Sequence, residues 1–217
     1  MQSNHTRIVA VAVLALSVSG CLSYSTLHGA EPVPEGESEV TAAPQGLAVQ
    51  DANGSGGFPS GEVAVRHGVS SNSDVGVKLF SLGAGVDYNH AFVDSPSFSA
   101  SVNPSFSAAH FADSVDDSEV GALGLLNVLA DVYKSDALAV TVGLKPGLAY
   151  AYHDPLFGSE TLGADTPVPL AGATAGVRIR VSDAFSVMPS VDAISPLAEQ
   201  PGESVRATGS VGFSYRL

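Results

Sequence analysis

The chain of 217 residues has no tryptophan, one cysteine and few basic residues, with nine Lys and Arg against 22 Asp and Glu. A single cysteine excludes an internal disulfide. The formal net charge of -13 argues against nucleic acid as a partner, because phosphate binding requires clustered Lys and Arg. Aromatic residues make up only 7% of the chain. The composition therefore excludes a disulfide-stapled fold and a nucleic-acid-binding protein.

Long hydrophobic runs are also missing from most of the chain. The only extended apolar run, residues 8–18, is too short to cross a bilayer as a helix. Mean hydropathy is nevertheless positive, at +0.23. If the polypeptide is embedded in a membrane beyond this run, it must form a closed β-barrel, because every backbone polar group needs a partner in lipid.

The first 21 residues have the pattern of a secretory signal: a weakly basic start, the apolar run, and small residues before Cys21. The sequence Val18-Ser19-Gly20-Cys21 resembles the lipobox of bacterial lipoproteins. This resemblance implies that Cys21 is acylated and that residues 1–20 are removed. Leu22 favours the outer membrane, because lipoproteins retained at the inner membrane often carry an acidic residue there. An ordinary secretory signal remains the alternative.

Residues 21–44 contain several Glu and Pro and predict a flexible tether, which leaves residues 45–217 for the folded domain. In that domain apolar and polar residues alternate, as in Val205 to Leu217 and Ala171 to Val181. Residues 120–132 are apolar enough for a buried helix, but their position between strand-like segments favours a strand. The pattern predicts ten strands, with eight as an alternative: 45–51, 61–69, 74–80, 85–93, 97–108, 119–133, 136–151, 168–181, 184–193 and 204–217.

Basic residues lie on the polar faces of these predicted strands. Seven of the nine Lys and Arg fall there: Arg66, Lys78, Lys145, Arg178, Arg180, Arg206 and Arg216. In a membrane barrel this face lines the lumen, where opposite charges can pair. In a soluble sandwich or lipocalin-like ligand-binding domain, the same residues would face solvent. We expect the lumen-facing arrangement.

The spacing of the strands predicts short turns at one end and longer connections, 52–60, 109–118, 152–167 and 194–203, at the other. The connection 81–84 breaks this alternation, because it is short but falls at the end of the longer ones. Outer-membrane barrels place short turns in the periplasm and long loops outside. The C-terminal residues 213–217 resemble the final strand of outer-membrane proteins, although Leu replaces the usual Phe. The domain as a whole resembles small bacterial outer-membrane β-barrels. This resemblance implies the outer-membrane lipids and the barrel-assembly machinery as partners.

No catalytic or metal-binding motif stands out, and we expect no enzyme activity, cofactor or metal. The six His residues show no shared ligand spacing. His110 and His153 lie in long connections near serines, which leaves a lipid-modifying enzyme at the barrel rim as a minor alternative. The sequence predicts an all-β, up-and-down transmembrane barrel lipoprotein with a structural, adhesive or narrow-pore role. No specific protein partner can be predicted.

Overall fold

A computed structural model describes residues 23–51, 54–81, 83–112, 118–150, 167–197 and 205–217. These residues form an all-β fold with no α-helix. The strands are β1 (Ser38–Asp51), β2 (Gly54–Ser70), β3 (Ser73–Phe80), β4 (Gly83–Asp94), β5 (Ser99–Ala112), β6 (Ser118–Lys134), β7 (Leu138–Leu144), β8 (Gly147–Tyr150), β9 (Val168–Arg180), β10 (Phe185–Pro196) and β11 (Val205–Arg216). In the part of the chain that is described, no helix is long and apolar enough to cross a membrane.

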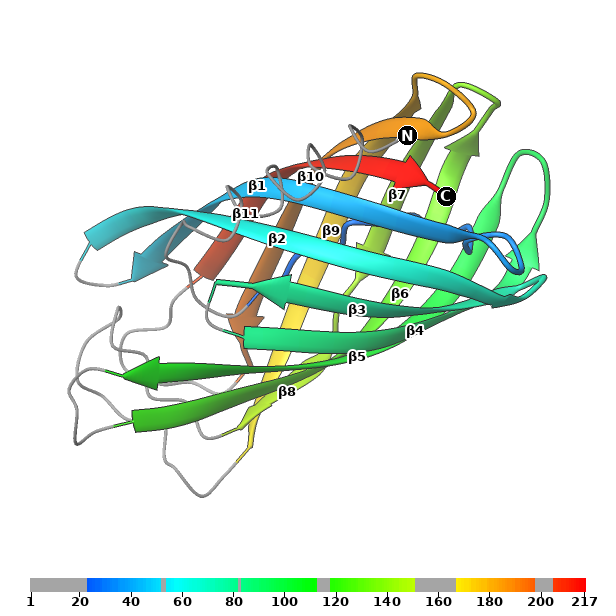
Figure 1. The fold of residues 1–217 in the computed structure, drawn as a ribbon. Helices are drawn as coiled ribbons and strands as arrows, with labels where there is room; N and C mark the ends of the chain where they lie inside the picture. The colour runs from blue at the N-terminus through cyan, green and yellow to red at the C-terminus, as the bar shows by residue number, and fades with distance from the viewer. Residues whose placement is uncertain (1–22, 52–53, 82, 113–117, 151–166, 198–204) are drawn as a thin grey trace, which may run out of the picture.

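Each strand pairs antiparallel with its neighbours, and the sheet closes on itself into a barrel (Figure 1). Strand β1 pairs with both β2 and β11, and β10 pairs with both β9 and β11. Strands β7 and β8 occupy one position between β6 and β9. The barrel thus has the ten strand positions that the alternation predicts, and the eight-strand alternative is wrong.

The seventh strand position is interrupted at Lys145 and Pro146. Proline has no backbone N–H, so it cannot donate to the ladder. Its carbonyl still accepts a hydrogen bond from the Leu126 N–H, at 2.9 Å. Because Leu144 pairs with Val128 and Gly147 with Leu125, both pieces keep one register against β6.

The barrel has an apolar outer surface and a polar interior. On β11, Val211, Phe213 and Tyr215 are exposed, whereas Ser210 and Ser214 are buried. Strand β3 shows the same arrangement, with apolar Val77 exposed and charged Lys78 buried. A soluble sandwich or lipocalin-like barrel would bury its apolar faces. That alternative is therefore wrong for this fold.

The two ends of the barrel differ in the length of their connections. One end, here called the short-turn end, carries the start of β1 and the end of β11. The turns 71–72, 95–98, 135–137 and 181–184 lie at this end as well. The opposite, long-loop end carries the connections 52–53, 81–82, 113–117, 151–167 and 197–204. The predicted connections 52–60 and 109–118 were too long, because β2, β5 and β6 continue into them as paired strands.

The predicted tether over residues 21–44 is wrong from Ser23 onwards. Residues 23–30 are buried, and β1 begins at Ser38 instead of residue 45. The chain passes through the barrel interior and turns at Gly36, whose φ of 80° suits glycine, before entering β1. We call residues 23–34 the luminal segment. Cys21 and the predicted signal, residues 1–20, lie outside the described residues.

Candidate functional site

The candidate functional site is the barrel lumen, which is lined with charged and amide side chains. Alternation along each strand places these side chains inside, where they are shielded from solvent. The inward residues that are buried and either charged or amide-bearing include Glu62, Arg66, Asp74, Lys78, Asn89, Asn103, Asn127, Asp131, Lys145 and Asp192. An apolar cluster that includes Tyr24, Phe80 and Leu123 lies inside the barrel as well.

Basic side chains of the wall hold the start of the luminal segment by its backbone carbonyls. The Lys145 ammonium donates to the carbonyl of Tyr24 and is also paired with Asp192. The Lys78 ammonium lies 3.4 Å from the carbonyl oxygen of Ser23. Because Lys145 and Asp192 are each only 1% exposed, their ion pair is shielded from water and from salt.

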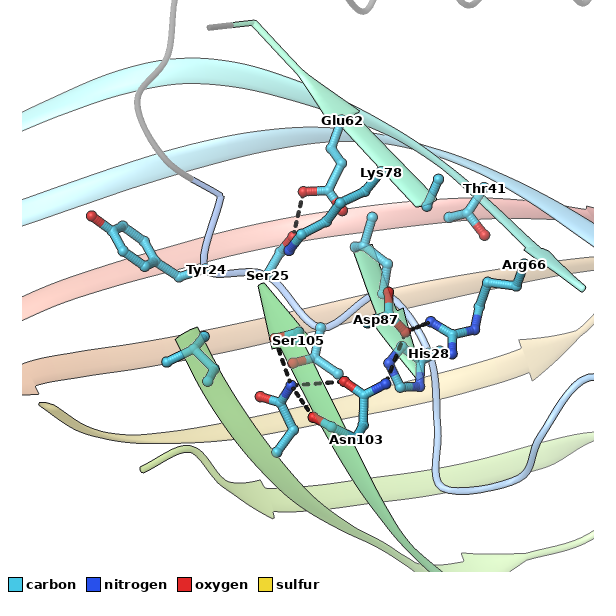
Figure 2. A pocket seen from close by; sticks show the side chains of 15 residues that line it. Tyr24, Ser25, His28, Thr41, Glu62, Arg66, Lys78, Asp87, Asn103 and Ser105 are labelled. Carbon is cyan, nitrogen blue, oxygen red and sulfur yellow. Dashed lines mark hydrogen bonds and ion pairs between the residues drawn. The ribbon is translucent and has the colours of Figure 1, made fainter. Parts of the chain in front are cut away.

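Glu62 meets the same part of the luminal segment through side-chain hydroxyls. Its carboxylate accepts hydrogen bonds from Ser23 and from Ser25, the latter at 2.9 Å. The Gln45 amide donates to the Ser25 hydroxyl at 3.0 Å. Figure 2 shows Ser25 close to Glu62 and Lys78, with the dashed contact between Ser25 and Glu62. Strands β1, β2 and β3 thus fix the same end of the segment.

Acidic side chains hold the rest of the luminal segment by its backbone N–H groups. The Asp131 carboxylate accepts from the N–H of Ala30 and of Glu31, both at 3.1 Å, and from the Thr141 hydroxyl at 2.6 Å. The Asp74 carboxylate accepts from the Val33 N–H at 2.8 Å. Buried backbone groups need such partners, because leaving them unpaired would cost free energy. Side chains of the lumen thus provide hydrogen-bond partners for the backbone of an extended segment that forms no strand of its own.

A cluster around Arg66 links five strands near His28 (Figure 2). The Arg66 guanidinium pairs with Asp74 and, at 2.6 Å, with Asp87. The Asn103 amide donates to the same Asp87 oxygen at 2.8 Å, and the Asn127 amide donates to Asn103 at 2.8 Å. This network joins β2, β3, β4, β5 and β6 across the interior. Because its charged groups are paired with one another, the cluster is suited to structural support.

The seven basic residues singled out from the sequence lie on the inner side of their strands, in two groups. Arg66, Lys78 and Lys145 are buried deep in the lumen. The other four are partly exposed. Arg178 lies 3.8 Å from Glu39, and Arg216 lies 3.5 Å from Glu37. Arg180 donates to the carbonyl of Asp136 at 3.2 Å, and Arg206 donates to the Tyr24 hydroxyl at 2.9 Å.

Sequence reasoning missed the luminal segment as part of the site. The absence of charge between Ser23 and Ala30 was the available signal, because a solvated tether would carry charges there. The matching acidic partners, Glu62 and Asp131, sit at inward positions of predicted strands. Their pairing with the segment, however, depends on a tertiary path that no local pattern encodes.

The rim site that the enzyme alternative requires lies partly outside the described residues. His110 is exposed on β5, and His153 lies outside the described residues. Two Ser–His contacts occur, Ser38 with His67 at 3.0 Å and Ser73 with His90 at 2.9 Å. Both involve the strand ends at the short-turn end. Across the described part of the chain, no group of His, Cys, Asp and Glu is arranged to hold a metal ion.

Comparison with known proteins gives likeness in fold only. No family model matches the chain, and no curated protein matches it. Solved structures that it resembles include the Neisserial surface protein A (13% identity, 83% of this chain and 99% of that one, TM-score 0.36). The translocator domain of the autotransporter NalP from Neisseria meningitidis matches at 12% identity, over 98% and 94% of the two chains, with a TM-score of 0.47. The attachment invasion locus protein Ail of Yersinia pestis matches at 13% identity, over 84% and 99%, with a TM-score of 0.34.

Proposed function

We propose that the chain is an outer-membrane β-barrel whose lumen is closed by its own luminal segment. The observation that supports the membrane location is the inverted surface, apolar outside and charged inside. Exposed aliphatic side chains encircle the barrel, among them Val77, Leu126, Val142, Ile179 and Val211. Such a surface would aggregate in water but is solvated by lipid.

Aromatic side chains support the same location. Several exposed ones lie towards the short-turn end: Phe92, Phe98, Tyr133 and Tyr215. Tyr150 is exposed near the long-loop end, at the last residue of β8. Aromatic girdles at the two interfaces are typical of outer-membrane barrels. With the short turns in the periplasm, the long loops face the cell exterior.

Within this location, a structural or adhesive role is favoured over transport. The luminal segment, the Arg66 cluster and the Lys145–Asp192 pair occupy the interior, which leaves no wide aqueous path through the part that is described. A ten-stranded barrel has a narrow lumen even without such a segment. Adhesion would use the long-loop end, because that face is presented to the surroundings of the cell.

Planar-bilayer recording tests the closed lumen. We expect the purified chain to insert without steady conductance, and a variant lacking residues 23–33 to show open-channel current. Heat-modifiable migration on cold SDS gels would confirm that both variants fold. Steady, ohmic current from the intact chain would contradict the closed lumen and favour the narrow-pore role.

We further propose that Cys21 is acylated, on the strength of the lipobox resemblance. A Cys21→Ser variant is expected to lose incorporation of labelled palmitate. Because the barrel embeds itself, this variant should stay in the membrane fraction and require detergent for extraction. Release of Cys21→Ser into the soluble fraction would show that the lipid alone holds the protein at the membrane. That result would contradict the membrane-barrel proposal. Assembly by the barrel-assembly machinery belongs to the same proposal.

A further inference from the structure

A small pocket lies at the short-turn end, where the end of β9, the start of β10, the end of β11 and the start of β1 come together (Figure 1). It encloses about 240 Å³, counting the space that is open to solvent. Its charged lining consists of three arginines, one buried carboxylate and one exposed carboxylate: Arg178, Arg180, Arg216, Glu39 and Asp183. We call this space the mouth pocket. It shares no lining residue with the cavity around the Arg66 cluster.

The mouth pocket is open because short side chains occupy the inward positions between its arginines. Ser186 of β10 pairs with Arg180 of β9 on one side and with Ser214 of β11 on the other, and both serines are buried. Arg178 of β9 comes within 3.8 Å of Glu39 on β1, so its side chain extends past both β10 and β11. The serines do not fill the space that this long side chain crosses.

The three guanidinium groups of the mouth pocket keep most of their donors free of other described residues. An arginine side chain carries five N–H donors in a fixed, planar arrangement. Among the described residues, Arg180 donates one hydrogen bond, to the Asp136 carbonyl, while Arg178 and Arg216 have only ion contacts, at 3.8 and 3.5 Å. Arg66 in the lumen differs, because both its terminal nitrogens donate to carboxylates. The arginines of the mouth pocket are therefore available to bind the two oxygens of a carboxylate.

Glu39 adds an acceptor of opposite charge to the same pocket. Its side chain is 4% exposed, and its Oε1 atom has no hydrogen-bond partner among the described residues. The nearest guanidinium nitrogen, Nη2 of Arg178, is 3.8 Å from that atom, which is beyond hydrogen-bonding distance. A buried carboxylate oxygen without a donor costs free energy. A ligand that completes this site should therefore bring a donor for Glu39 as well as an acceptor for the arginines.

We propose that the mouth pocket binds a compact zwitterion, such as a free amino acid. The carboxylate of the ligand accepts from Arg180 and Arg216, and its ammonium group donates to Glu39. The charges of the lining favour a zwitterion over a plain anion, because Glu39 and Asp183, together with Glu37 beside Arg216, oppose the three arginines. The volume favours a small molecule, since sites for drug-sized ligands enclose about 300–1,000 Å³. The site depends neither on the closed lumen nor on the direction in which the barrel faces.

Isothermal titration calorimetry on the full chain, folded in detergent micelles, tests this proposal. Glycine serves as the zwitterion, acetate as the carboxylate alone and methylammonium as the ammonium alone. We expect saturable binding of glycine, with acetate and methylammonium each weaker by about tenfold or more, because each lacks one set of charge-assisted hydrogen bonds. Equal affinities for glycine and acetate would overturn the proposal in favour of a plain anion site. The absence of saturable heat with glycine would overturn it altogether.

Two substitutions separate the two ends of the ligand. Arg180→Gln should weaken glycine and acetate alike, by about tenfold. Glu39→Gln should weaken glycine by a similar factor but leave acetate unchanged or tighter, because acetate brings no donor to this position. The matched control is Arg206→Gln, since Arg206 is also an inward arginine but binds the Tyr24 hydroxyl and does not line the mouth pocket.

The control variant is expected to bind glycine like the unsubstituted chain, and heat-modifiable migration shows which variants fold. If Arg206→Gln weakens glycine as much as Arg180→Gln, binding does not occur in the mouth pocket and the proposal fails. It fails as well if Glu39→Gln weakens acetate and glycine equally. Should Glu39→Gln not fold, the comparison of the three probes on the unsubstituted chain still decides between a zwitterion site and an anion site.

Discussion

Removal of the Lys145 charge is expected to destabilise the barrel strongly. The Lys145 ammonium is 1% exposed, pairs with the equally buried Asp192, and donates to the Tyr24 carbonyl of the luminal segment. A Lys145→Met variant keeps the volume but leaves the Asp192 carboxylate with the Thr26 N–H, at 3.4 Å, as its one remaining donor among the described residues. Stranding one partner of a buried ion pair costs about 3–5 kcal/mol, so we expect a loss of that size in the free energy of unfolding.

Urea unfolding in lipid vesicles, followed by heat-modifiable migration, measures this loss. Lys134→Met is the matched control, because Lys134 pairs with Asp94 and Glu31 at the barrel rim, where Asp94 is 42% exposed. An exposed pair of this kind is worth about 0–1 kcal/mol. The double variant Lys145→Met with Asp192→Leu removes both charges, and it should recover most of the lost stability. If Lys145→Met costs no more than Lys134→Met, the lumen is hydrated and the account of a filled interior is refuted.

Three further substitutions test the outer face and the luminal segment. Val211→Arg puts a charge on the apolar face and should lower the free energy of unfolding in vesicles by about 2–4 kcal/mol. The control Val181→Arg, at the short-turn rim, should lower it by about 0–1 kcal/mol. Equal losses would contradict a membrane-embedded outer face. Gly68→Ala brings a Cβ into the backbone of the luminal segment and should cost roughly 1–3 kcal/mol. Its control, Gly46→Ala, meets open space and should be neutral or slightly stabilising in the same assay. Asp131→Ala strips two backbone N–H groups of their acceptor, so hydrogen exchange at those amides should speed up; unchanged exchange would show that they are held otherwise.

The strands could be predicted because alternation is a local property. In β11 each residue's face follows from its neighbours two positions away, so Val211 and Phe213 are placed outside from the sequence alone. The position of residues 120–132 between strand-like segments predicts a strand there as well, and β6 confirms it. Strand ends were harder to predict. The extra length of β2 runs through Gly, Ser and Pro residues that are typical of a loop, yet they pair with β1 throughout residues 54–61.

The luminal segment could not be predicted, because its stability comes from partners far along the chain. Ala30 is bound by Asp131 and Thr26 by Asp192, over separations of 101 and 166 residues. The absence of charge from residues 23–30 distinguishes them from a solvated tether, but no local pattern identifies the distant groups that bind them. The inward basic residues, in contrast, were identifiable from the alternation of inward and outward positions along each strand. Their pairing, such as Lys145 with Asp192, required the closed barrel.

Tryptophan fluorescence in vesicles tests whether the barrel is embedded in lipid and filled by its luminal segment, because the chain contains no tryptophan and a single introduced one reports alone. Two variants suffice: Val211→Trp on the outer face and Tyr24→Trp in the luminal segment. We expect brominated lipid to quench Val211→Trp, while Tyr24→Trp is shielded from both brominated lipid and aqueous iodide. Iodide quenching of Tyr24→Trp to the level of an unfolded chain, or a Val211→Trp signal that ignores brominated lipid, would contradict a lipid-embedded barrel closed by its own N-terminal segment.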